Sequence, residues 1–177
     1  MTATSRQLTL PFPKDEEGKS LCRWCKGPLE GRRISWCSDK CVEDYKDRYH
    51  ASWQRRQVKK RDKGVCALCG LDTHAFREEL KRRYREAFPG DAYIHVTLLA
   101  KTPECLAWLE QHGMTLKDIK FSRKGMRSFW QADHPVPVVE GGGGTPWQEL
   151  RTLCSACHRK ETKALAKRRA LARKAEK

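Results

Sequence analysis

The sequence has no long apolar segment. Its first twenty residues carry Pro11, Pro13 and the charged run Lys14-Asp15-Glu16-Glu17, and they lack the apolar core of a secretory signal. No other stretch approaches the roughly 20 apolar residues that a membrane helix needs. We therefore expect a cytoplasmic protein in a reducing compartment, with no membrane partner.

Apolar residues are also too few for a large core. They make up 38% of the 177 residues, while charged residues make up 33%. This length suits one ordinary domain or two small ones. We expect a small apolar core whose stability is supplemented by bound metal.

Acidic residues are scarce relative to basic ones. The chain has 22 Asp and Glu against 37 Lys and Arg, a net charge of +15. A charge of this size favours a polyanionic partner, and no apolar amphipathic face accompanies it to suggest a membrane surface. Nucleic acid is therefore the expected partner, and a merely solubilising surface is the alternative.

Cysteine is abundant. Eight of the nine cysteines form four pairs: Cys22/Cys25, Cys37/Cys41, Cys66/Cys69 and Cys154/Cys157. In a reducing compartment such pairs bind metal rather than form disulfides. Four thiolates complete one tetrahedral zinc site, so eight predict two structural zinc ions. The ninth, Cys105, lies in an apolar helical pattern and is expected to be a buried, inert thiol.

The spacing of the pairs predicts how they combine. The first two pairs are local, and residues 21–41 read as a knuckle, a short hairpin from Pro28 to Trp36 and a helix start, the ligand order of a treble-clef finger. The pairs at 66/69 and 154/157 are far apart, but neither has another partner. We expect them to close the second zinc site together.

Helical and extended patterns follow the cysteines. Residues 1–20 predict a flexible tail with Leu8, Leu10 and Phe12 as docking positions, and 42–65 a basic connecting helix. An insert at 71–125 is expected to hold helices at 73–88 and 103–111, while 93–99 fits a strand or a helical turn. Residues 129–133 predict a strand, 135–139 an extended segment, 141–144 a flexible glycine loop and 154–174 a basic helix, whose end occupies 166–177. The fold class is small, zinc-stabilised α+β.

One joint pattern lies between the halves of the second zinc site. It runs from the doublet Asp133-His134 and Pro135-Val-Pro-Val138, through Gly141–Gly144, to Leu-Cys-x-x-Cys-His158 at a helix start. This pattern resembles the HNH, or ββα-metal, endonucleases. Within that family it is similar to the zinc-bearing nuclease domain that animals fuse to a Swi/Snf-type annealing translocase, and to stand-alone bacterial proteins with an N-terminal Cys-rich finger. The core match covers about residues 64–165 without the insert.

The resemblance implies a second treble-clef unit, residues 66–165, that carries a nuclease site. Asp133 and His158 would hold one catalytic divalent ion, Mg²⁺ or Mn²⁺. His134 points away from Asp133 because side chains alternate along a strand, so it would serve as general base on water. The base must be neutral, so activity should rise with pH. The family's products are a 3′-hydroxyl and a 5′-phosphate.

Each of these residues has a simpler interpretation. Asp133 fits a turn or cap, His134 fits packing against Trp130, and His158 fits a helix cap or a zinc ligand in place of a cysteine. The glycine run fits a plain linker. Three tryptophans near basic residues fit base stacking, although packing in a small zinc unit is preferred: Trp24, Trp36 and Trp53.

One position departs from the family pattern. The family has Asn before the Leu-x-x-Leu-Cys stretch, and this chain has Glu149. Glu149 would either add a third oxygen ligand to the catalytic ion, or leave the site weak or inactive. A shift in register that gives the role to Gln148 is a further alternative.

The basic C-terminal helix is expected to bind phosphates on either side of the scissile one. Its predicted DNA contacts are Arg159, Lys160, Lys163, Lys167 and Arg168. A solvated face is the alternative. No base-reading element is evident, so we expect a DNA endonuclease that is structure-selective or of low sequence specificity. A zinc-dependent DNA-binding adaptor and an RNA nuclease are the competing hypotheses. The resemblance also implies a helicase or translocase partner, and nucleoid association in a bacterial cell.

Overall fold

The computed structural model describes residues 12–91, 93–122 and 125–175. Its helices are α1 (Asp39–Tyr49), α2 (Ala51–Asp62), α3 (Thr73–Ala87), α4 (Val96–Leu99), α5 (Pro103–Gln111) and α6 (Ser155–Ala175). Its strands are β1 (Phe121–Ser122), β2 (Gly125–Met126), β3 (Trp130–Asp133) and β4 (Arg151–Cys154), and 3-10 turns occupy Leu116–Asp118, Val138–Glu140 and Trp147–Glu149. Among the described residues no helix combines the length and apolarity needed to cross a membrane.

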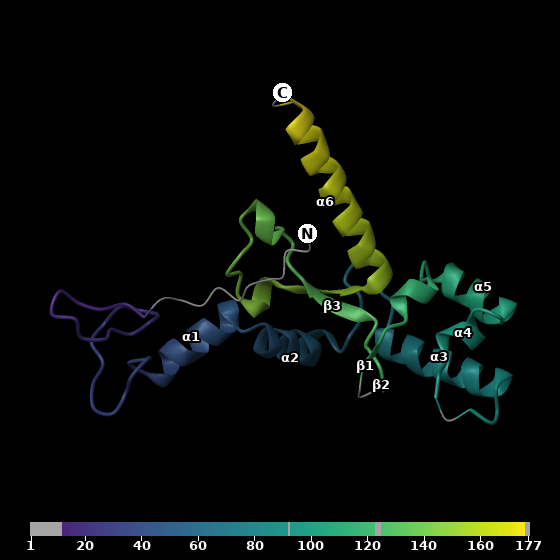
Figure 1. Cartoon of the computed structure of the whole chain (residues 1–177), viewed down its shortest axis with the longest axis horizontal. Coiled ribbons are helices and arrows are strands. Elements are labelled where there is room, and N and C mark those ends of the chain that lie inside the picture. Colours follow the sequence, from purple (N-terminus) through teal and green to yellow (C-terminus); the bar gives the residue numbers. More distant parts are fainter. Residues whose placement is uncertain (1–11, 92, 123–124, 176–177) are drawn as a thin grey trace.

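The elements form an elongated body (Figure 1). The N-terminal cysteine-rich unit lies at one end, α1 and α2 run toward the middle, and α3, α4 and α5 form the other end. Helix α6 projects from the middle, so its C-terminal part stands away from the body. The small α+β fold expected from the sequence is confirmed.

An antiparallel strand pair lies at the centre of the fold. Strands β3 and β4 pair with Trp130 opposite Cys154 and Asp133 opposite Arg151. Because side chains alternate along a strand, Trp130 and the residues that share its face turn toward α2, where Trp130 packs against Val58 and Leu150. Asp133 and Arg151 share the other face, toward α6.

The C-terminal turn of α2 holds the chain that leads into β4. The Arg61 guanidinium donates to the backbone carbonyls of Gln148 and Leu150. The Thr152 backbone N–H donates to Asp62 Oδ2 at 3.1 Å. Part of the basic helix predicted at 42–65 is therefore a structural support. The region is two helices rather than one, because His50 interrupts it and accepts a hydrogen bond from the Trp53 N–H through Nδ1.

The insert forms most of the main core. Phe76, Leu80 and Tyr84 of α3 are buried, as their spacing of four predicts. They belong to one cluster with Leu109 of α5 and Leu153 of β4. Cys105 is buried in the same cluster, as expected. The region 93–99, which fits a strand or a helical turn, contains the short helix α4. The insert therefore supports the strand pair rather than forming a separate unit.

The N-terminal region departs from the sequence-based prediction. The segment 28–36 contains no strand, and its regular pairing is one bridge between Leu21 and Pro28. Residues 12–20, predicted as part of a flexible tail, form a turn closed by a bridge between Lys14 and Ser20. The exposed ring of Phe12 lies 4.2 Å from the Arg23 guanidinium. The predicted docking positions at 8 and 10 lie outside the described residues.

The loop between β3 and β4 is also more compact than predicted. The extended segment 135–139 ends in a 3-10 turn at Val138–Glu140. The Gly142 N–H donates to the Pro137 carbonyl at 3.1 Å, and a Cβ at Gly142 would lie 1.8 Å from the Val136 carbonyl oxygen. Gly142 is therefore required by close backbone packing, not by flexibility.

The tryptophans of the N-terminal half pack within the body. The Trp24 ring lies 6.2 Å from Tyr49, and the Trp36 ring lies 4.8 Å from Tyr45. Trp53 Nε1 donates to Asp47 Oδ1 at 2.8 Å. These contacts favour the packing interpretation over base stacking.

Candidate functional site

Two cysteine tetrads have the geometry of metal sites. In each, four sulfur atoms lie within 4.8 Å of one another; the tetrads are Cys22, Cys25, Cys37, Cys41 and Cys66, Cys69, Cys154, Cys157. Sulfur–sulfur distances include 3.4 Å between Cys25 and Cys37 and 3.7 Å between Cys69 and Cys154. Four ligands about 2.3 Å from a tetrahedral zinc lie about 3.8 Å apart, so both tetrads suit zinc. The pairing across the insert is as predicted.

The pKa values of two thiols in the first tetrad shift in opposite directions. Burial raises the pKa of the Cys22 thiol, but hydrogen bonds from the backbone at Cys25, Cys37 and Trp24 bring it down to about 6. Hydrogen bonds with the Cys41 and Cys25 thiols raise the pKa of Cys37 to about 12. Four adjacent sulfurs therefore cannot all ionise unless a metal compensates their charge.

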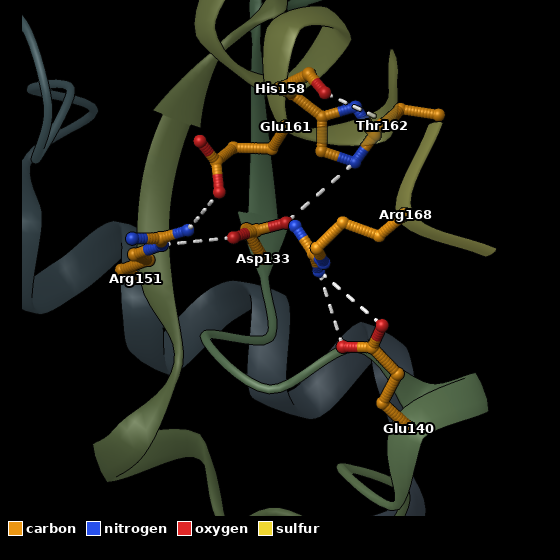
Figure 2. A network of polar contacts seen from close by, with 7 residues as sticks. All are labelled: Asp133, Glu140, Arg151, His158, Glu161, Thr162 and Arg168. Carbon is orange, nitrogen blue, oxygen red and sulfur yellow. Dashed lines mark hydrogen bonds and ion pairs between the residues drawn. The ribbon is translucent and has the colours of Figure 1, made fainter. Parts of the chain in front are cut away.

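Asp133 and His158 converge beside the second tetrad (Figure 2). Asp133 ends β3, while His158 lies in the first turn of α6, directly after the tetrad residue Cys157. Asp133 Oδ1 lies 3.9 Å from His158 Nε2. The Asp133 side chain is 13% exposed and that of His158 is 33% exposed. The second tetrad thus includes the start of α6, and His158 there faces the end of the strand.

This arrangement fits a divalent ion. A distance of 3.9 Å exceeds that of a hydrogen bond, but an ion bonded to each atom at about 2.1 Å fits between them. The carboxylate oxygen suits Mg²⁺ or Mn²⁺, and the imidazole nitrogen is a common ligand of transition-metal ions. Among the described residues, groups of three or more clustered ligands occur only in the cysteine tetrads, so water and phosphate oxygens would complete the shell. His158 is not needed by the zinc tetrad, which already has four sulfurs.

A cavity of about 210 Å³ opens over these residues. Asp133, His134, Arg151 and His158 all line it. Strand alternation predicted that His134 would point away from Asp133, but β3 ends at Asp133, and His134 lines the same cavity. Burial lowers the pKa of the His134 imidazole, and the nearby Asp133 charge opposes this shift. The neutral imidazole is the form that accepts a proton. The cavity is large enough for several water molecules.

Glu149 does not reach the cavity. It ends the 3-10 turn Trp147–Glu149 with an exposed side chain, and it is absent from the residues that line the cavity. Gln148 is exposed too, and its side chain lies 3.5 Å from Asp47 Oδ2. The geometry therefore supports neither the third-ligand hypothesis for Glu149 nor the register shift to Gln148.

The predicted phosphate contacts on α6 divide into two groups. Arg159 donates to both carboxylate oxygens of Asp118 and to the Gly113 carbonyl, so it ties α6 to the insert. Arg168 lines the cavity and pairs there with Glu140 at 3.2 Å. The remaining three side chains, those of Lys160, Lys163 and Lys167, are exposed. They follow His158 by about one half, one and a half, and two and a half helical turns, respectively. They therefore point away from the cavity.

Other residues of the site were not singled out from the sequence. Arg151, Glu161 and Thr162 line the cavity. Glu161 and Thr162 follow His158 by three and four residues, which places them on its helical face. Helical periodicity also puts the exposed Arg169 and Arg173 about three and four turns after His158. Arg151 could be located only once the register of β3 and β4 was known.

One family model matches the part of the chain that carries this site. Residues 118–164 match the family model described as HNH endonuclease. The match spans β3, the following loop, β4 and the first half of α6, and so includes Asp133, His134 and His158. This part of the chain is therefore similar to the HNH endonucleases, as its sequence pattern predicts.

The chain is also similar in sequence to particular curated proteins. The chain is 34% identical over 171 residues to the DNA annealing helicase and endonuclease ZRANB3 of Mus musculus, and 33% identical to that of Homo sapiens. Each alignment covers 90% of this chain and 15% of the relative, so the chain spans about 15% of the length of the curated relatives it matches. The crystal structure of the human ZRANB3 HNH domain is 29% identical and covers 71% of this chain and 97% of that one, with a TM-score of 0.39.

Proposed function

We propose that this chain is a metal-dependent endonuclease that hydrolyses phosphodiester bonds in DNA. The observation that carries the proposal is the approach of Asp133 Oδ1 to His158 Nε2, at 3.9 Å, in a cavity that His134 also lines. The HNH family match supports the same reaction class. The net charge of +15 supports a polyanionic substrate.

Each side chain then has a distinct role. Asp133 and His158 would hold a Mg²⁺ or Mn²⁺ ion, and such an ion would supply stabilisation of negative charge on the phosphate and the leaving oxygen. His134 takes a proton from water at an imidazole nitrogen. That water attacks phosphorus, the bond to the 3′ oxygen breaks, and the 3′ oxygen takes a proton from solvent water, so a 3′-hydroxyl and a 5′-phosphate result. The two cysteine tetrads hold structural zinc, whose thiolate ligands suit a reducing, intracellular setting.

Substrate selection follows from what the described residues offer. Basic side chains line the exposed part of α6, and we identify no base-reading element in the sequence. We therefore expect recognition of DNA shape or branching, or cleavage of low sequence specificity, with RNA as a second substrate to be tested. The combined helicase and endonuclease names of the relatives support a helicase or translocase as partner.

A nicking assay tests the proposal. The chain is incubated with supercoiled plasmid, branched DNA or RNA, with Mg²⁺, Mn²⁺ or EDTA. We expect ion-dependent nicking, and His134→Ala should lower its rate by at least about 100-fold, because general-base catalysis contributes about 10²–10⁴. Zinc content and DNA affinity should stay unchanged. His95→Ala is the matched control, because His95 is exposed and lies outside the residues that line the cavity. Parental-rate cutting by His134→Ala would refute the assignment.

One observation favours the second candidate function, a zinc-dependent DNA-binding adaptor. Glu149 stands where the family has Asn and does not line the cavity, so the site lacks one of its usual side chains. The adaptor hypothesis predicts tight, salt-sensitive DNA binding with no ion-dependent cleavage on any of the substrates. The same assay therefore separates the two.

A further inference from the structure

Arg151 joins the two elements that carry the proposed ion ligands. We propose that Arg151 is a positioning residue that holds one oxygen of Asp133 toward His158 and thereby sets the affinity of the site for its divalent ion. This inference rests on the proposed function, because it assumes that Asp133 and His158 bind that ion. It assigns a role to a residue that the sequence pattern alone did not single out.

The strand register places Arg151 where it can act on Asp133. The two residues lie directly opposite each other in the antiparallel pair, so their side chains emerge on one face about 5 Å apart at Cβ. Arg151 Nε donates to Asp133 Oδ2 at 2.9 Å. Both side chains are largely shielded, with 26% of Arg151 and 13% of Asp133 exposed. A charge-assisted hydrogen bond in such a place holds its geometry better than one in open solvent.

The same guanidinium reaches the helix that carries His158. Arg151 Nη2 lies 3.3 Å from Glu161 Oε2, and Glu161 follows His158 by one turn of α6 (Figure 2). Arg151 therefore bridges β3 and α6 between two carboxylates. A guanidinium carries its N–H donors on several nitrogens in a rigid plane, so it can contact both carboxylates at once. The donors of a lysine ammonium all lie on one nitrogen.

The consequence for Asp133 is that its two oxygens differ. Oδ2 accepts from Arg151, and Oδ1 faces His158 Nε2. Rotation of an Asp carboxylate about its last bond is otherwise broad, so without Arg151 neither oxygen would be fixed toward the ion. Removal of a partner that orients a metal ligand typically costs about 10–100-fold in affinity or activity.

Arg151 also carries a positive charge, which acts in the opposite direction. Removing that charge alone strengthens cation binding, because it leaves Glu161 and Asp133 unneutralised. The double variant Arg151→Gln/Glu161→Gln removes one charge of each sign, so the net charge of the site is unchanged while the bridge is lost. A positioning role therefore predicts weaker ion binding in the double variant, and a role through charge alone predicts no change.

The experiment measures Mn²⁺ binding to the zinc-loaded chain by electron paramagnetic resonance. DNA nicking by the same variants is measured in parallel. Asp133→Asn defines the background from other weak sites. We expect the double variant to raise the Mn²⁺ dissociation constant about tenfold or more. Arg151→Lys, which keeps the charge, should also bind more weakly than the parent. Arg82→Gln/Glu86→Gln, a matched charge-neutral change in an exposed ion pair on α3, should bind like the parent.

The outcomes separate this inference from the proposed function. Parental Mn²⁺ affinity in both the double variant and Arg151→Lys, with two zinc ions retained, would overturn the inference while leaving the nuclease intact. No Asp133-dependent Mn²⁺ binding in the parent would overturn it too. Mn²⁺ binding without nicking in the parent would contradict the proposed function. In that case, weaker Mn²⁺ binding by the double variant would still support the role of Arg151.

Discussion

Asp133 shows how one carboxylate can serve two neighbours. One oxygen accepts from Arg151 and the other faces His158. The carboxylate is mostly buried, so both contacts are made away from bulk water, where a fixed orientation has the largest effect. The chemistry of the site therefore depends on the rotamer of a single side chain and on what holds that rotamer.

Glu149 gives a prediction at the same scale. Glu149→Ala should leave the nicking rate and the Mn²⁺ affinity within about twofold of the parent, because an exposed side chain outside the cavity rarely matters by more than about 0.5 kcal/mol. The measurement is a nicking time course across Mn²⁺ concentrations. A large loss of rate with zinc content unchanged would show that Glu149 moves into the site when DNA binds.

The basic side chains of helix α6 lie on different sides of the helix. His158, Thr162, Leu165 and Arg168 line the cavity. Helical periodicity puts Arg169 and Arg173 on the same side, along the part of the helix that projects from the body (Figure 1). Lys160 and Lys163 lie on the opposite side, although they are closer to His158 in sequence. Distance along the chain is therefore a poor guide to which cations lie on the side of the cavity.

This arrangement predicts unequal effects of basic substitutions. Arg169→Gln/Arg173→Gln should weaken DNA binding and lower the salt dependence by about two ion equivalents, because each phosphate contact releases about one counterion. Lys160→Gln/Lys163→Gln removes the same charge from the other face and should have the smaller effect. Fluorescence anisotropy on duplex and branched DNA at several salt concentrations measures both. Equal losses would indicate a diffuse electrostatic effect.

The loop between β3 and β4 shows why composition misleads about an element. Four consecutive glycines indicate flexibility, but Gly142 packs against the Val136 carbonyl with no room for a side chain. The Thr145 hydroxyl donates to the Gly142 carbonyl, and Gln54 of α2 donates to the Thr145 carbonyl. The loop is held by contacts that the local sequence does not reveal.

At the scale of the whole molecule, the second cysteine tetrad links distant parts of the chain beside the candidate site. It joins a knuckle at 66–69 to the start of α6, where His158 lies, while the first tetrad lies at the far end of the body (Figure 1). The apolar core is small, so zinc bound at the tetrads would contribute directly to folding. The two tetrads should therefore differ in their effect on catalysis.

A matched pair of substitutions tests this difference, because each tetrad has one exposed cysteine. Cys69→Ser should lower zinc content by about one ion and nicking by about tenfold or more, since it loosens the helix that positions His158. Cys25→Ser should lose a similar amount of zinc but keep most of the nicking activity. Zinc analysis, thermal melting and the plasmid assay provide the measurements. Equal loss of activity in both variants would mean that the two zinc units fold as one.

The sequence by itself determined the features that depend on local spacing. These are the two tetrads, the amphipathic helices of the insert, and the doublet Asp133-His134 with His158, because ligand spacing and helical periodicity are written along the chain. Tertiary structure alone decided that Arg151 bridges Asp133 and Glu161, that Glu149 stays outside the cavity, and which cations of α6 face it. Those outcomes depend on strand register and helix direction, which arise when segments distant in sequence pack against each other.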